Sequence, residues 1–137
     1  MKNLTVAATL ENLDTVLDFI ARELTSAGCP EPVRMQVAVA AEEIYVNIAN
    51  YAFRQETGDA TVSCEAGGDP ACVTVRFTDG GRPYNPLNRP DPDITLPAED
   101  RQIGGLGVFM AKNYMDEVTY DNRDGKNILT MKKRWNP

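Results

Sequence analysis

Apolar residues recur along this chain with two different periods, and the changes between the periods divide it into elements. Apolar and polar positions alternate over residues 4–8, which predicts a first strand. Apolar residues then recur at helical spacing over residues 13–24, and Gly28 is expected to end that helix. Pro32 can begin a second helix, whose apolar stripe continues to about Phe53.

Strand patterns return after the second helix. Residues 61–65 and 72–78 predict a hairpin around Gly67-Gly68-Asp69-Pro70, and Cys64 and Cys72 could be neighbours across it. Two closing strands are expected at Glu117–Tyr120 and Lys126–Lys133, joined by a turn at residues 121–125.

A proline-rich stretch at residues 85–103 interrupts this rhythm and reads as a loop. A loop of this length within a compact domain is usually functional or disordered. From Gly105 a third helix is expected to run as far as Met115. The order β-α-α-β-β-loop-α-β-β predicts an α+β fold, a two-layer sandwich with helices on one face of a sheet.

Composition narrows the class of protein. The 137 residues suffice for one domain, 1–137, with a single core, and no apolar run approaches a membrane span. The N-terminus lacks the apolar segment of a signal peptide, so a cytoplasmic protein without membrane attachment is expected. The net charge is −6 and the one basic cluster is Lys132-Lys133-Arg134, which argues against a nucleic-acid groove.

Cysteine and histidine usage excludes several chemistries. The three cysteines are an odd number without metal-ligand spacing, so they are expected to be reduced packing residues. The chain has no histidine, which removes Ser-His-Asp triads, histidine-based zinc sites and any phosphohistidine acceptor within it.

The second helix carries polar residues beside its apolar stripe. Glu43 and Asn47 are four residues apart and share a face, and Asn50 extends this polar stripe at the rim of the core. A carboxylate there could accept a proton from a hydroxyl, and a neutral amide oxygen could complete a Mg²⁺ shell. The spacing also fits an ordinary solvated stripe, and it leaves Glu42 open as a surface charge or as the base.

Two glycine turns flank the proline-rich stretch. Asp79 ends a strand just before Gly80 and Gly81, where its carboxylate could accept from an exocyclic amine such as that of adenine. Gly104-Gly105-Leu106-Gly107 opens a helix, where free N–H groups and the helix dipole favour a phosphate. Each motif alone also fits an ordinary turn, and neither is a Walker loop or a dinucleotide fingerprint. Their order along the chain is more informative than either one.

In that order, the segments resemble the motifs of the histidine-kinase-like ATPase superfamily. Glu43–Phe53 is similar to its N box, Asp79–Pro86 to its first glycine box and Gly104–Gly107 to its second. The tail from Met115 to Asn127 also fits, so the resemblance spans nearly the whole chain. It is closest to the stand-alone anti-sigma-factor serine/threonine kinases of bacteria. It implies a Bergerat-type ATP-binding fold, in which three helices cover one face of a mixed, mostly antiparallel sheet.

The resemblance also implies roles for residues. Glu43 would be the catalytic base, residues 86–103 the ATP lid, and Arg101 in that lid could approach the terminal phosphate. Tyr51 stands where these kinases often have histidine. The residues that would bind ATP and Mg²⁺ are Asn47 (also the metal ligand), Asn50, Asp79, Gly81, Pro83, Gly104, Gly105, Leu106 and Gly107, with Thr130 as a candidate for a water-mediated adenine contact.

The function implied is transfer of the ATP γ-phosphoryl group to a serine or threonine of an anti-anti-sigma (STAS-type) protein, with sequestration of a sigma factor. The family commonly dimerises, so a homodimer is one state that the resemblance allows. One alternative is an ATP-gated protein-binding module with little or no kinase activity. Another is the ATP-binding fragment of a sensor kinase, whose phosphate acceptor would then lie on another chain.

Overall fold

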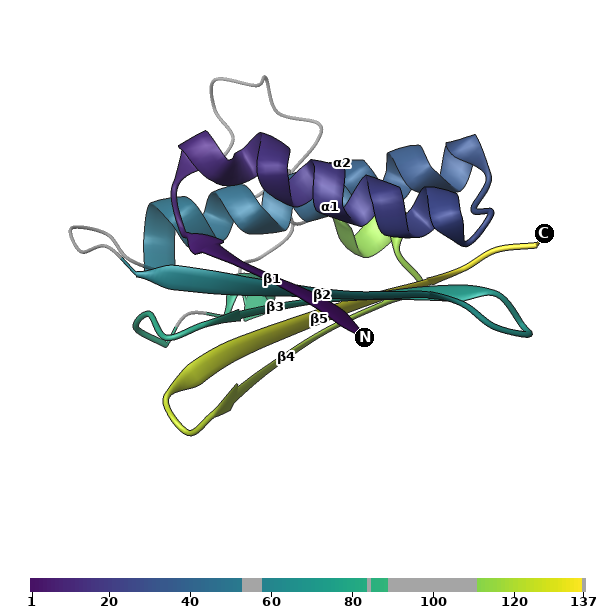
Figure 1. Ribbon diagram of the computed structural model, residues 1–137. Helices are drawn as coiled ribbons and strands as arrows, with labels where there is room; N and C mark the ends of the chain where they lie inside the picture. Colours follow the sequence, from purple (N-terminus) through teal and green to yellow (C-terminus); the bar gives the residue numbers. More distant parts are fainter. Residues whose placement is uncertain (53–57, 84, 89–110, 137) are drawn as a thin grey trace, which may run out of the picture.

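The computed structural model describes residues 1–52, 58–83, 85–88 and 111–136. They form two layers, a sheet and helices packed on one of its faces (Figure 1). The elements are β1 (Lys2–Ala7), α1 (Leu13–Ser26), α2 (Glu31–Asn47), β2 (Asp59–Gly67), β3 (Cys72–Asp79), β4 (Glu117–Arg123) and β5 (Lys126–Arg134), with short helical turns η1 (Leu10–Asn12), η2 (Ile48–Ala52) and η3 (Pro86–Asn88).

The sheet has the strand order β1-β2-β3-β5-β4, and each of its pairings is antiparallel. The α+β two-layer sandwich is therefore confirmed. The expected sheet was mixed and mostly antiparallel, and among the described strands every pairing is antiparallel. Of the expected third helix, residues 111–114 are helical and lie on the same side of the sheet as α1 and α2. Gly105–Met110 lie outside the described residues.

Alternation along the central strands separates the core from an open face. On β3, Val73, Val75 and Phe77 are buried under the helices, whereas Arg76 between them is exposed. Among the described residues, the largest fully buried side chain is Tyr45 of α2, whose hydroxyl donates to the backbone carbonyl of Thr9, 2.6 Å away. The helical layer is thereby tied to the end of β1 by a hydrogen bond as well as by packing.

Glycine ends α1 as expected. Gly28 has a φ of +74°, the left-handed conformation that glycine adopts without strain. Its N–H donates to the carbonyl of Thr25, and the N–H of Cys29 donates to that of Leu24, which together form a Schellman motif. Two residues later α2 begins at Glu31, close to the predicted start.

The second helix ends differently from the prediction. The α-helix stops at Asn47, and residues 48–52 continue as a π-helical turn, whereas one uniform helix to about Phe53 was expected. Phe53 lies outside the described residues. Single π-turns occur mainly within longer helices and are frequent at functional sites, so the end of α2 is a candidate location for a functional site.

The two hairpins confirm the predicted turn between the closing strands and correct the predicted position of Cys64 relative to Cys72. The turn between β4 and β5 is at Asp124-Gly125, both with positive φ, which matches the twist of a tight hairpin. In the β2–β3 hairpin, Cys64 stands opposite Val75 and not opposite Cys72, so the suggested pairing of these cysteines is wrong. All three cysteines are free. None of the helices that the structure describes is long and apolar enough to cross a membrane.

Candidate functional site

A small, partly open pocket lies between the end of α2 and the sheet. Its walls come from six elements, α2, η2, β3, η3, β4 and β5, which span the chain from Ile44 to Leu129. The residues lining it are Ile44, Asn47, Ile48, Phe77, Asp79, Pro86, Tyr120, Asn127 and Leu129. Most of this wall is apolar, and the polar side chains enter it at a few points, as is typical of small-molecule sites.

Asn47 is one of these polar side chains. It is only 4% exposed, whereas its place in the stripe predicted a half-buried side chain. Its Nδ2 donates to the backbone carbonyl of Glu43, 2.8 Å away, at the point where the α-helix gives way to η2. With Nδ2 engaged in this way, the amide oxygen is the atom of Asn47 that can serve a ligand.

Glu43 is half-buried, one turn before Asn47 on α2. Burial raises the pKa of its carboxyl above the ordinary value for glutamate, and the negative charge of Glu42 raises that pKa further. A raised pKa makes the ionised carboxylate a stronger proton acceptor, which suits a general base. Sequence left both glutamates open for this role, and the pKa of Glu43 is shifted in the direction that a base requires.

Asp79 is 4% exposed at the end of β3 and carries the first glycine turn. The N–H of Gly81 donates to Asp79 Oδ1 over 2.9 Å, and Asn127 Nδ2 donates to the same oxygen over 3.0 Å. The first contact is an Asx-type turn, which accounts for the sharp bend after the strand. Both hydrogen bonds that Asp79 accepts from described residues go to Oδ1, so Oδ2 is left as an acceptor in a residue that lines the pocket.

Asn127 was not predicted as a site residue. It lies directly opposite Asp79 in the β3–β5 register and is 5% exposed. The available signal was its spacing from Leu129 and Met131, which are also buried, because residues two apart share a face of a strand. Ile128 blurred that signal, since two adjacent apolar residues leave the alternation along β5 ambiguous.

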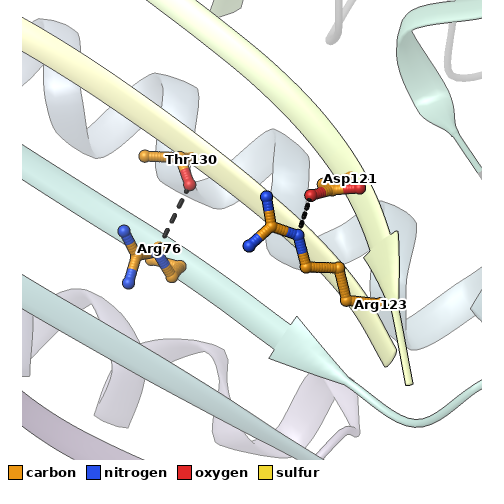
Figure 2. Close-up of polar contacts among 4 residues, drawn as sticks. All are labelled: Arg76, Asp121, Arg123 and Thr130. Carbon is orange, nitrogen blue, oxygen red and sulfur yellow. Dashed lines mark hydrogen bonds and ion pairs between the residues drawn. The ribbon is translucent and has the colours of Figure 1, made fainter. Parts of the chain in front are cut away.

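Thr130 is not beside the pocket. Its Oγ1 lies 3.4 Å from the Nε of Arg76 on the open face of the sheet, in a shallow groove with Glu117, Thr119 and Lys132. Figure 2 shows Thr130 and Arg76 side by side on neighbouring strands, with the helices behind the sheet. Thr130 is three residues from Asn127, which stands opposite Asp79. Residues at odd spacing on one strand point to opposite faces, so Thr130 points away from the face that carries Asp79.

The other predicted residues are spread more widely. Gly81 is buried in the turn after Asp79, whereas Asn50 in η2 and Pro83 are exposed. None of these three residues lines the pocket. Of the expected lid, residues 86–88 form the turn η3, and Pro86 closes one side of the pocket. The second glycine turn (Gly104, Gly105, Leu106 and Gly107) and Arg101 lie outside the described residues.

The described half of the site therefore combines an apolar slot with a carboxylate acceptor at one end and a helix bearing an amide and a carboxylate beside it. An apolar slot suits a planar ring, and Asp79 can accept a hydrogen bond from an amino group on that ring. Asn47 can offer an amide oxygen to a hard cation. Glu43 can accept a proton from a group brought close to α2.

Comparison with known proteins adds two findings. A family model described as the histidine kinase-like ATPase domain matches residues 6–133, nearly the whole chain. The chain is also similar to the serine/threonine-protein kinase BtrW of Bordetella bronchiseptica. The two sequences are 27% identical over 99 residues, which cover 72% of this chain and 69% of that protein.

Proposed function

The chain belongs to the histidine kinase-like ATPase domain family, and we propose that it phosphorylates a serine or threonine of a partner protein with ATP. The family match confirms the resemblance that the three motifs indicated. The similarity to a serine/threonine-protein kinase further supports the proposed kinase activity. One structural observation supports this proposal at the level of residues: Asp79 and Asn47, which come from different elements, line the same apolar pocket.

The pocket fits the adenine ring in its chemistry. Adenine is planar and presents an amino group at its 6-position, and the free Oδ2 of Asp79 is an acceptor without a competing partner among the described residues. Phe77, Leu129 and Ile48 supply apolar walls for the faces of such a ring. Gly81, buried in the turn beside Asp79, has no side chain that would stand between such a ring and the backbone.

Asn47 and Glu43 suit the chemical end of the reaction. Asn47 would hold Mg²⁺ through its amide oxygen, and the bound cation would supply positive charge against the transferring phosphoryl group. Glu43 takes the proton of the acceptor hydroxyl as that oxygen forms its bond to the γ-phosphorus and ADP leaves. The phosphates themselves are assigned to the amides of Gly104–Gly107, as the motif predicts.

The proposed substrate is an anti-anti-sigma protein of the STAS type, and the proposed second partner is a sigma factor that the chain sequesters. Both come from the resemblance to anti-sigma kinases. In this arrangement the negative charge added by phosphorylation weakens the substrate's hold on the kinase, so that the sigma factor is retained. A homodimer is the oligomeric state proposed with it.

Mass spectrometry of captured proteins tests the proposal. The purified chain is incubated with cell extract and Mg²⁺, with and without ATP, and the bound proteins are scored for phosphoserine and phosphothreonine. ATP-dependent phosphorylation of one partner, lost in Glu43→Gln and kept in Glu42→Gln, is the expected result. ATP-dependent capture without any phosphorylated residue would instead identify an ATP-gated binding module.

A further inference from the structure

We propose that Asn127 and Tyr120 are positioning residues that hold the Asp79 carboxylate as a reader of the purine 6-position. They would thereby set a preference for 6-amino over 6-oxo purine nucleotides. The inference rests on the proposed function only in that the pocket must bind a purine nucleotide. It does not depend on phosphoryl transfer or on the identity of a partner.

Asn127 links the two sides of the first glycine turn. Its Nδ2 lies 3.0 Å from Asp79 Oδ1 and 3.0 Å from the backbone carbonyl of Arg82, with the carbonyl of Gly81 at 3.5 Å. The two hydrogens of one amide group thus bridge the end of β3 and the chain three residues later. A buried amide in this position fixes both the carboxylate and the course of the turn.

Tyr120 and Asn122 determine which way the Asn127 amide faces. The Tyr120 hydroxyl donates to Asn127 Oδ1, and Asn122 Nδ2 donates to the same oxygen over 3.1 Å. An amide that accepts at its oxygen must present its NH₂ group on the other side, towards Asp79. The hydroxyl on β4 therefore controls, through Asn127, which atoms of Asp79 are occupied.

The result is a carboxylate with its two oxygens in different roles. Asp79 Oδ1 accepts from Gly81 and Asn127, while Oδ2 accepts nothing from the described residues. An ionised carboxylate has no proton to donate, so this oxygen pairs with the amino group of adenine and repels the 6-oxo group of hypoxanthine or guanine. If Asn127 were lost, the carboxylate could rotate in the pocket, and the discrimination would fall.

Nucleotide titrations of variants test this directly. The affinities of ATP, ITP and inorganic tripolyphosphate are measured by calorimetry for the wild type, Asn127→Leu, Tyr120→Phe and the control Thr119→Val. Thr119 is next to Tyr120 on β4 but is exposed on the open face of the sheet. We expect the ATP-to-ITP preference to fall about tenfold in Asn127→Leu and about threefold in Tyr120→Phe. Tripolyphosphate affinity should be unchanged in both, as should every affinity of Thr119→Val.

A double-mutant comparison separates positioning from a general loss of structure. In an Asp79→Ala background, adding Asn127→Leu should change the ATP-to-ITP preference by less than about twofold, because the residue through which Asn127 acts is gone. A full effect in that background overturns the proposal, as does a wild-type preference in both Asn127→Leu and Tyr120→Phe. If Asn127→Leu does not fold, Tyr120→Phe, which removes only a hydroxyl, decides alone.

The same titrations distinguish this inference from the proposed function. A wild-type chain that binds neither nucleotide overturns both. Phosphoryl transfer is not measured in the titrations, so its failure in a kinase assay bears on the proposed function alone.

Discussion

The side-chain Nδ2 of Asn47 lies 2.8 Å from the backbone carbonyl oxygen of Glu43, one turn earlier on α2. This hydrogen bond joins the two residues that the N-box motif singles out, and it does so through the backbone of one and the side chain of the other. It fixes the orientation of the Asn47 amide, and it stands where the α-helix changes into the π-turn η2. The amide oxygen is thereby directed away from the helix and is available to a cation.

Asn47→Ala should remove the dependence of ATP affinity on Mg²⁺. In the wild type, the affinity measured by calorimetry should be higher with Mg²⁺ than with EDTA, because the cation joins the protein to the phosphates. The variant should bind ATP with the same affinity under both conditions, close to the wild-type value in EDTA. A Mg²⁺ effect of wild-type size in Asn47→Ala would show that another group holds the cation.

Glu43→Gln should leave ATP affinity within about twofold of the wild type and lower phosphoryl transfer by about 10²–10⁴-fold, the usual contribution of a general base. Glu42→Gln is the matched control, because it keeps the Glu43 carboxylate. It removes a charge that raises the pKa of Glu43, so transfer should be kept at a pH above that pKa. The wild-type rate should rise with pH through the raised pKa of Glu43, since only the ionised carboxylate accepts a proton. Unchanged transfer in Glu43→Gln would remove Glu43 as the base.

The sequence predicted the layers of this fold because the periods of its apolar residues are clear, as on β3, where Val73, Val75 and Phe77 alternate with polar residues. It predicted Asp79 and Asn47 because chemistry-bearing residues stood beside glycine or at helical spacing. The sequence could not predict on which face of the sheet Thr130 and Asn127 lie. Ile128 and Leu129 are adjacent apolar residues, so tertiary packing decides which face of β5 is buried.

The end of α2 shows a second limit of the sequence. A uniform spacing of 100° per residue put Asn50 on the same stripe as Asn47, but the π-turn that begins at Ile48 changes this spacing. Asn50 is exposed and Asn47 is buried. The hydrogen bond from the Asn47 side chain to the Glu43 carbonyl also lies at this point, and a periodic pattern of apolar residues does not represent such a local contact.

Glu43 should also reduce stability at neutral pH. Its folded-state pKa is raised by burial and by Glu42, so the folded chain holds the proton more tightly than the unfolded chain. The protonated Glu43 carboxyl contributes stability to the fold below the ordinary pKa of glutamate. This contribution is lost as pH rises through the raised folded-state pKa, where the buried carboxylate becomes charged. Glu43→Gln should therefore have a higher melting temperature than the wild type at pH 7, with the difference shrinking towards pH 4. A difference independent of pH would contradict this origin.

The cysteines should differ in reactivity. Burial raises the pKa of Cys64 to about 12, and burial also raises that of Cys29, so both thiols stay protonated at pH 8. Cys72 is partly exposed. Ellman's reagent should react quickly with one thiol per native chain and with all three in denaturant, because the thiolate is the nucleophile. Cys72→Ser should abolish the fast reaction; a fast thiol remaining in that variant would contradict the burial of the other two.

Asp79→Asn should reverse the base preference of the pocket. The donors of Gly81 and Asn127 that now reach Asp79 Oδ1 would hold the amide oxygen of the new side chain. Its NH₂ group would then take the place of Oδ2 and pair with a 6-oxo group rather than a 6-amino group. We expect the ratio of ATP to ITP affinity to fall about a hundredfold, whereas Asp79→Ala should bind the two nucleotides about equally. Calorimetric titration of both variants measures this. An Asp79→Asn chain that prefers ATP as strongly as the wild type would show that the adenine amine is read elsewhere.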